Sequence, residues 1–112
     1  MGQEGVVVAG GLNDFASSAT TSEIFLLETE EWMDGPKLPR EFGFGGQVSP
    51  TDSTLMLAGG MDKAGNTYDN IILLDSSQAQ KMEDLKFEIA ESKMQIPRFL
   101  FAMAVVYDID EC

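Results

Sequence analysis

The sequence VVVAGG at residues 6–11 and the sequence LMLAGG at residues 55–60 decide the fold. Each runs three apolar residues and an alanine into a pair of glycines, and the two stretches are about 50 residues apart, a spacing typical of repeated structural units. Glycine lacks a Cβ atom and adopts positive φ readily, so two in a row predict a strand that ends in a sharp turn. The chain therefore repeats one structural plan.

Other apolar runs follow each glycine pair, and they have the features of strands. They are short, are bounded by Gly, Pro, Asn, Asp or Ser, and are rich in β-branched and aromatic residues. The runs at 6–8 and 55–57 do not alternate with polar residues, which predicts strands buried on both faces between stacked sheets. We expect an all-β chain with strands at about 5–9, 22–28, 31–34, 41–48, 54–58, 69–75, 85–90 and 99–107.

Residues 79–94 fit two patterns. Met82, Leu85 and Ile89 have helical spacing, whereas Leu85, Phe87 and Ile89 alternate as in a strand. The Glu and Lys content favours a helical turn, but the repeat requires a strand within this segment. We therefore expect a strand at about 85–90 after a solvated insertion.

The first unit resembles the kelch repeat. In that repeat an apolar strand ends in a glycine pair, and an aromatic residue, usually Tyr, precedes a Trp by six intervening residues. Here Gly10 and Gly11 are followed by Phe25 and then, after six residues, by Trp32. A Leu-Pro-Arg sequence at 38–40 closes the unit.

The second unit departs from this pattern. Gly59 and Gly60 are present, and Ile-Pro-Arg stands at 96–98, but no Trp follows the apolar run at 71–74. Counting back from the acidic residue that ends the run places Ile72 where Phe25 stood, and Phe87 is the best candidate for the Trp position.

The resemblance implies kelch-type β-propeller blades, each an antiparallel four-stranded sheet. Residues 1–112 would then form a single partial propeller, with one blade at about 5–40 that lacks its first strand, a second at 41–98, and the first strand of a third at 99–112. Closed propellers have about four to eight blades, so we expect an incomplete propeller and a fragment of a longer protein. The structural repeat positions are Gly10, Gly11, Phe25, Trp32, Pro39, Arg40, Gly59, Gly60, Pro97 and Arg98.

Each repeated position has a structural and a functional interpretation. The glycine pairs could cradle phosphate, but they lack the spacing of nucleotide-binding loops and precede no helical pattern, which favours turns. Phe25 and Trp32 are expected to fill the space between packed sheets, with ligand stacking as the alternative. Arg40 and Arg98 are expected to make structural bonds, with the recognition of an acidic partner as the alternative.

The composition argues against catalysis. The chain has no histidine, so it lacks the commonest general base and any Ser-His or Cys-His pair. The segment at 62–70 superficially resembles a calcium loop, but its glycine stands at the fourth position and no terminal Glu follows. Some propellers with this repeat, galactose oxidase among them, are copper enzymes that use Tyr, His and Cys ligands, and the missing histidines disfavour that chemistry. We therefore expect no catalytic residue, metal or other cofactor.

The charge favours some partners over others. Nineteen acidic and seven basic residues give a net charge of −12, which disfavours nucleic acid and favours basic proteins; a surface that only aids solubility is the simpler explanation. Cys112 is the only cysteine, and the sequence has no signal peptide or membrane-spanning run, which together favour the cytoplasm.

The sequence favours a non-catalytic protein–protein interaction module. In such a module, loops at one rim of the propeller would bind the partner, and the polar segments 12–22 and 61–68 are the candidates. The alternatives are a fragment of a propeller enzyme of the galactose-oxidase or sialidase type and a degenerate product without independent function. The candidate partner-binding residues are Asn13, Asp14, Phe15, Asp62, Lys63 and Asn66.

Overall fold

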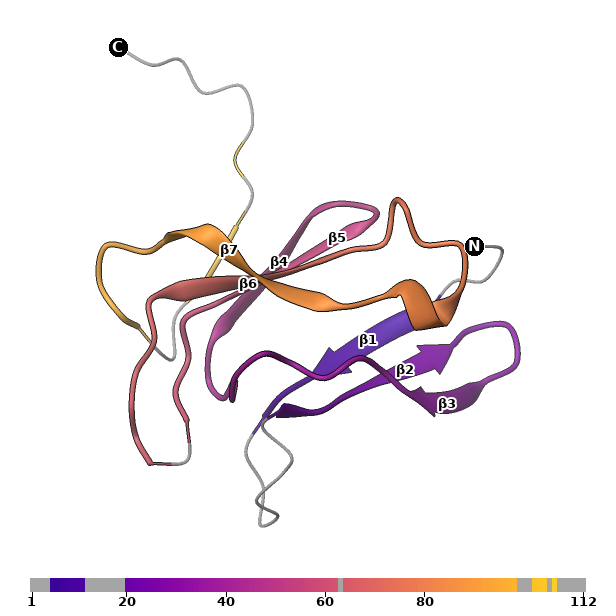
Figure 1. The fold of residues 1–112 in the computed structure, drawn as a ribbon, viewed down its shortest axis with the longest axis horizontal. Coiled ribbons are helices and arrows are strands. Elements are labelled where there is room, and N and C mark those ends of the chain that lie inside the picture. Colours follow the sequence, from indigo (N-terminus) through magenta and orange to yellow (C-terminus); the bar gives the residue numbers. More distant parts are fainter. Residues whose placement is uncertain (1–4, 12–19, 63, 99–101, 105, 107–112) are drawn as a thin grey trace.

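Two antiparallel sheets make up the computed structural model, which describes residues 5–11, 20–62, 64–98, 102–104 and 106 (Figure 1). The first sheet has the order β1-β2-β3, formed by β1 (Gly5–Ala9), β2 (Ser22–Leu26) and β3 (Glu31–Asp34). The second has the order β4-β5-β6-β7, formed by β4 (Gly46–Thr51), β5 (Thr54–Ala58), β6 (Asn70–Asp75) and β7 (Phe87–Lys93). These residues contain no α-helix and form no closed ring of sheets.

The expected all-β class is confirmed, and most strands lie where the sequence places them. The strand expected at 41–48 begins later, at Gly46, because Phe44 has a φ of 55° and interrupts extended backbone. Before it, Gly43 makes only an isolated bridge to Met61. Of the strand expected at 99–107, residues 102–104 and 106 are described and belong to no strand, and the others lie outside the described residues.

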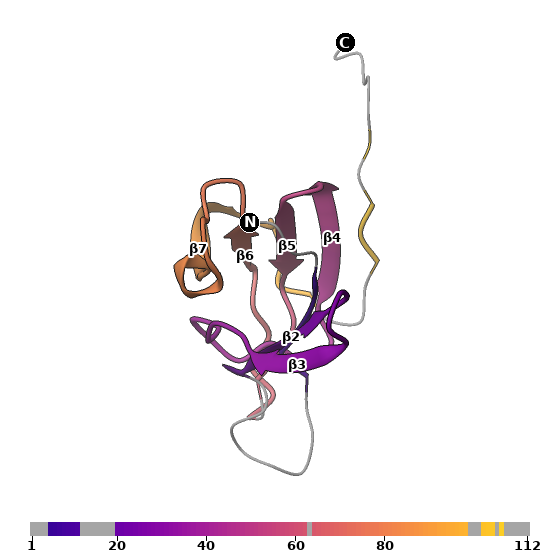
Figure 2. The ribbon, with the colours of Figure 1, turned by 90° about the vertical axis from the view of Figure 1, so that its right-hand side faces the viewer.

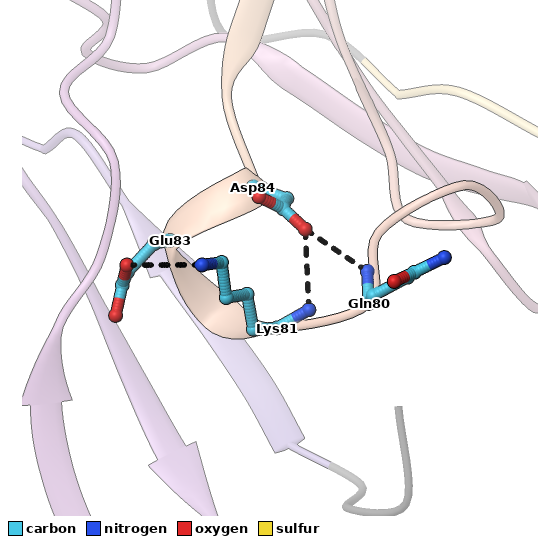
Figure 3. A network of polar contacts seen from close by, with 4 residues as sticks. All are labelled: Gln80, Lys81, Glu83 and Asp84. Carbon is cyan, nitrogen blue, oxygen red and sulfur yellow. Dashed lines mark hydrogen bonds and ion pairs between the residues drawn. The ribbon is translucent and has the colours of Figure 1, made fainter.

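The ambiguous segment contains both of the predicted conformations in succession. A single 3₁₀ turn, η2 (Met82–Asp84), precedes β7. The Asp84 carboxylate accepts hydrogen bonds from the backbone N–H groups of Gln80, at 3.1 Å, and Lys81, at 3.3 Å (Figure 3). Lys81 Nζ also lies 3.8 Å from Glu83 Oε2, but both side chains are exposed, so this ion pair contributes little to stability. The hydrogen bonds of Asp84 therefore stabilise the turn locally, and the residues from Phe87 onward join the second sheet as β7.

The core lies between the two sheets, which pack face against face (Figure 2). Val7, Ile24 and Met33 lie opposite one another on β1, β2 and β3, and such a set of cross-strand neighbours is called a row below. Because side chains alternate between the two faces of a strand, this row faces the second sheet. Side chains from both sheets and from the segments between them form one buried cluster: Ile24, Leu38, Phe42, Leu57, Ile72, Leu74, Leu85 and Phe87. Neither sheet could bury this apolar surface alone.

The two glycine pairs have matching backbone conformations. Gly10 and Gly59 have φ of 71° and 63°, and Gly11 and Gly60 have φ of 93° and 86°. These values lie in the region that favours glycine, as the sequence analysis expects for turns.

The hydrogen bonds of the glycine pairs also match. The N–H groups of Gly10 and Gly59 donate to the backbone carbonyls at the start of the next strand, those of Thr21 and Asn70, at 2.8 and 3.1 Å. The N–H groups of Gly11 and Gly60 donate to carbonyls that follow the last strand of the same sheet, those of Phe42 and Arg98, at 2.6 and 2.7 Å. The sheets are therefore repeats of one unit in their hydrogen bonding as well as in their sequence.

The register assigns equivalent side chains in the two sheets. In the first sheet Val6 pairs with Phe25, which pairs with Trp32; in the second, Leu55 pairs with Leu74, which pairs with Phe87. Phe87 thus takes the Trp32 position, as predicted. Leu74, and not Ile72, takes the Phe25 position, because the two acidic residues used for counting are not equivalent: Asp75 is the last residue of β6, whereas Glu28 lies two residues beyond the end of β2.

The equivalent rows differ in burial, and this corrects the expected role of Trp32. Leu74 and Phe87 are 5% and 6% exposed and belong to the core, whereas Trp32 is 56% exposed. The ring of Trp32 contacts Phe25 at a centroid distance of 5.0 Å, on the face of the first sheet that points away from the second. Trp32 does not fill the space between the sheets, because the alternation of β3 turns it outward.

Alanine substitutions in the glycine pair test its backbone conformation. In Gly10→Ala the new Cβ would meet the carbonyl oxygen of Phe42 as well as a strained φ, whereas in Gly11→Ala it would meet open space. We expect Gly11→Ala to lower the free energy of unfolding by about 1–2 kcal/mol and Gly10→Ala to lower it by more than about 2 kcal/mol. Denaturant unfolding measures both, and an equal or reversed order would contradict the described turn.

A second pair of substitutions tests the assignment of inner and outer faces. Ile72 is 0% exposed, so Ile72→Ala should cost about 2–5 kcal/mol. Trp32→Ala should cost only about 1–2 kcal/mol in dilute protein, because less than half of its surface is buried. The comparison is made by denaturant unfolding of both variants. A larger loss for Trp32→Ala would place this residue in the core and reverse the faces.

Candidate functional site

A polar network lies at the glycine end of the second sheet, around the loop 61–68 (Figure 1). The Asp62 carboxylate is its centre. Oδ1 accepts a hydrogen bond from the backbone N–H of Asn66 at 2.8 Å, and Oδ2 accepts from Asn66 Nδ2 and from the Tyr68 hydroxyl, both at 3.0 Å. The backbone N–H of Asp62 donates to the Asn66 carbonyl at 3.0 Å, which closes the loop on itself.

Arg40 joins this network to the backbone of the second sheet. Its Nε donates to Asn70 Oδ1 at 2.6 Å, and Nη2 donates to the carbonyl of Gly59 at 2.7 Å. Its guanidinium carbon lies 4.3 Å from the centroid of the Tyr68 ring, a cation–π geometry. Arg40 thus holds the connection between the sheets against the turn after β5.

Arg98 lies differently from Arg40. Its side chain is exposed, and its backbone makes the structural bonds. The Arg98 N–H donates to the Tyr68 carbonyl at 3.3 Å, and the Arg98 carbonyl accepts from Gly60. The adjacent residues Pro39 and Pro97 are both exposed.

The environment shifts the pKa values of three groups in the network. Hydrogen bonds from the Asn66 side chain, and then from the Asn66 backbone, lower the pKa of Asp62. Burial, followed by the hydrogen bond to Asp62, raises the pKa of Tyr68. Burial lowers the pKa of Arg40, while Tyr68 and Asp69 act in the opposite direction. The network therefore favours a charged Asp62 beside a neutral Tyr68.

These bonds restrict what the glycine end can do chemically. All four N–H groups of the glycine pairs donate to backbone carbonyls, so they are not directed at a phosphate. Both oxygens of Asp62 accept hydrogen bonds from within the loop. Within the described residues no group of three His, Cys, Asp or Glu side chains is placed to hold a metal ion. The polar atoms of this end therefore fix the shape of a loop.

The candidate residues from the sequence are divided between described and undescribed positions. Asn13, Asp14, Phe15 and Lys63 lie outside the described residues. Of the other two, Asp62 is 7% exposed and points into the loop, whereas Asn66 is exposed at its tip. Asp62 thus supports the loop from within, and Asn66 donates to it while remaining exposed.

A hollow of about 770 Å³ lies between the sheets at the end away from the glycine pairs. Val7, Ile24 and Leu55 contribute to its apolar lining. Asp52 is the only ionisable residue among the described residues that line it. The hollow therefore lacks a pair of groups suited to general acid and base chemistry.

The outer face of the first sheet is a surface that the sequence analysis missed. Val6 and Val8 are 49% and 48% exposed, although their non-alternating run predicts burial on both faces. With Phe25 and Trp32 they form an apolar area on one side of the sheet. Glu23 and Asp34 lie opposite one another on this same face. These two acidic residues were the signal in the sequence that the face is not part of the core.

No protein-family model matches the chain, and no curated protein matches it either. Among the described residues, no helix is long and apolar enough to cross a membrane.

The charge of Asp62 should make stability depend on acid pH. Because its pKa is lower in the folded protein, the unfolded chain binds protons more readily, so stability is lost as pH falls from the ordinary carboxyl range through the folded pKa. Asp62→Asn should lose less stability over this range, as measured by denaturant unfolding at a series of pH values. An NMR titration midpoint of Asp62 at or above the ordinary carboxyl pKa would contradict the described hydrogen bonds.

Proposed function

We propose that the two sheets are neighbouring blades of a kelch-type propeller and that the chain is a non-catalytic protein–protein interaction module. The matched φ angles and hydrogen bonds of the glycine pairs support the repeat. The equivalence of the Phe25–Trp32 pair to the Leu74–Phe87 pair supports the alignment of both units with the kelch pattern.

The main support for an interaction function is the loop 61–68, whose shape is fixed by hydrogen bonds within it. Asp62 and Tyr68 hold its base, and Arg40 holds Tyr68 against the sheet. The exposed residues Ala64, Gly65 and Asn66 form the tip. A loop whose shape is fixed before binding loses less conformational entropy on contact with a partner, which favours recognition.

The same contacts argue against catalysis at this end. The ionisable side chains of Asp62, Tyr68 and Arg40 are each held by hydrogen bonds or ring contacts to neighbouring parts of the chain. Among the described residues that line the hollow at the opposite end, Asp52 is the only ionisable one. The net charge of −12 further favours a partner with a positively charged surface.

The loop tip is tested by comparing Ala64→Lys with Asp52→Asn. Both changes raise the net charge by one. Ala64 is exposed at the tip, and its substitution keeps the hydrogen bonds between Asn66 and Asp62, whereas Asp52 is exposed in the turn between β4 and β5 at the opposite end. Proteins that co-purify with the wild-type chain from its native cells are quantified by mass spectrometry. We expect Ala64→Lys to reduce their recovery by about tenfold, equivalent to about 1.4 kcal/mol, and Asp52→Asn to preserve it. Equal recovery with both variants would contradict binding through this loop.

A further inference from the structure

The outer face of the first sheet carries large apolar side chains, as a buried face does, but it is exposed to solvent. Its row Val6–Phe25–Trp32 is equivalent to Leu55–Leu74–Phe87 in the second sheet. The second sheet has Leu74 and Phe87 buried beneath the first sheet, at 5% and 6% exposure. In the first sheet, Val6 and Trp32 remain 49% and 56% exposed. Clustered exposed apolar side chains of this kind mark contact surfaces.

The neighbouring row shows how the open face differs chemically. In the second sheet the row is Leu57–Ile72–Ile89, and in the first sheet the equivalent row is Val8–Glu23–Asp34. Thus two carboxylates stand where the second sheet has two isoleucines. Glu23 on β2 and Asp34 on β3 lie directly opposite one another, and both are exposed. The open face therefore combines an apolar row with a row that carries two negative charges.

This combination selects the kind of surface that can cover it. An entirely apolar partner would remove Glu23 and Asp34 from water without compensation, which is costly. A partner with Lys or Arg beside its apolar side chains could pair with both carboxylates. An Arg of that partner could also stack on Trp32, whose ring is accessible at the edge strand β3.

A second copy of the chain fits this requirement poorly. The outer face of its second sheet carries the row Met56–Leu73–Glu88, which is equivalent to the row Val7–Ile24–Met33 that already covers the second sheet. That face would bring the ion pair of Lys86 and Glu88, at 3.1 Å, toward Glu23 and Asp34, so it adds a carboxylate there and its lysine already has a partner. The chain's net charge of −12 adds general repulsion between copies.

We propose that the outer face of β1, β2 and β3 binds a cationic, amphipathic segment of another protein. Apolar side chains of that segment cover Val6, Val8 and the Phe25–Trp32 pair, and its Lys or Arg side chains pair with Glu23 and Asp34. This surface is separate from the loop 61–68, so the proposal stands or falls independently of binding through that loop.

Trp32 provides a direct probe, because it is the only tryptophan in the chain and lies on the face itself. The probe ligand is a synthetic peptide in which valine and arginine alternate, and the comparison peptide has glutamate in place of arginine. We expect the arginine peptide to shift Trp32 fluorescence saturably, with an affinity that falls as salt is raised, and the glutamate peptide to cause no shift. Absence of a saturable shift with the arginine peptide would overturn the proposal.

Charge-neutral variants separate this face from general attraction to an acidic protein. The double substitution Glu23→Gln/Asp34→Asn should weaken the arginine peptide at least about tenfold, and Asp52→Asn/Glu91→Gln, which removes the same charge elsewhere, should weaken it by less than about twofold. Equal losses in the two double variants would overturn the proposal. Sedimentation measurements that show self-association, strengthened by salt and abolished by Val8→Arg, would instead assign the face to a second copy.

Discussion

The hydrogen bonds of the glycine pairs are the constraint on which the rest of the structure depends. Each pair follows a strand, turns the chain at positive φ, and donates to two carbonyls, one at the start of the next strand and one after the last strand of its sheet. One pair of adjacent residues thus connects the beginning, middle and end of a unit of about 50 residues. A side chain at Gly10 or Gly60 would collide with the backbone at Phe42 or Gly43, which explains why glycine is needed there.

The same backbone plan leads to different surfaces in the two sheets. The second sheet presents Leu57, Ile72 and Leu74 to the first and is covered by it. The first sheet presents Val8, Glu23 and Phe25 on the equivalent face, where they remain partly or largely exposed. The repeat therefore explains the fold, and the departures from it explain where a partner could bind.

The sequence was sufficient for what depends on local backbone chemistry. The glycine turns and the strands at 5–9, 31–34 and 54–58 follow from residue type and spacing. It was insufficient where the outcome depends on what covers a side chain. Trp32 and Val8 belong to apolar patterns typical of a core, but burial requires a second layer, which a strand pattern alone does not specify.

The polar network shows the same limit for the candidate site. Asp62 and Asn66 are both polar residues of one loop, and the sequence could not distinguish them. In the folded chain, Asn66 and Tyr68, which follow Asp62 in the same loop, both donate hydrogen bonds to its buried carboxylate, whereas Asn66 itself stays exposed. Which polar residue of a loop is buried is decided by such donors, and residue type alone does not specify them.

Nuclear Overhauser contacts in solution test whether the two sheets are equivalent units. We expect cross-strand contacts within the row Val6–Phe25–Trp32 and, at the equivalent places, within the row Leu55–Leu74–Phe87. Contacts within only one of these rows in a folded protein, or contacts that pair Phe25 with a residue other than Val6 and Trp32 across the strands, would contradict it.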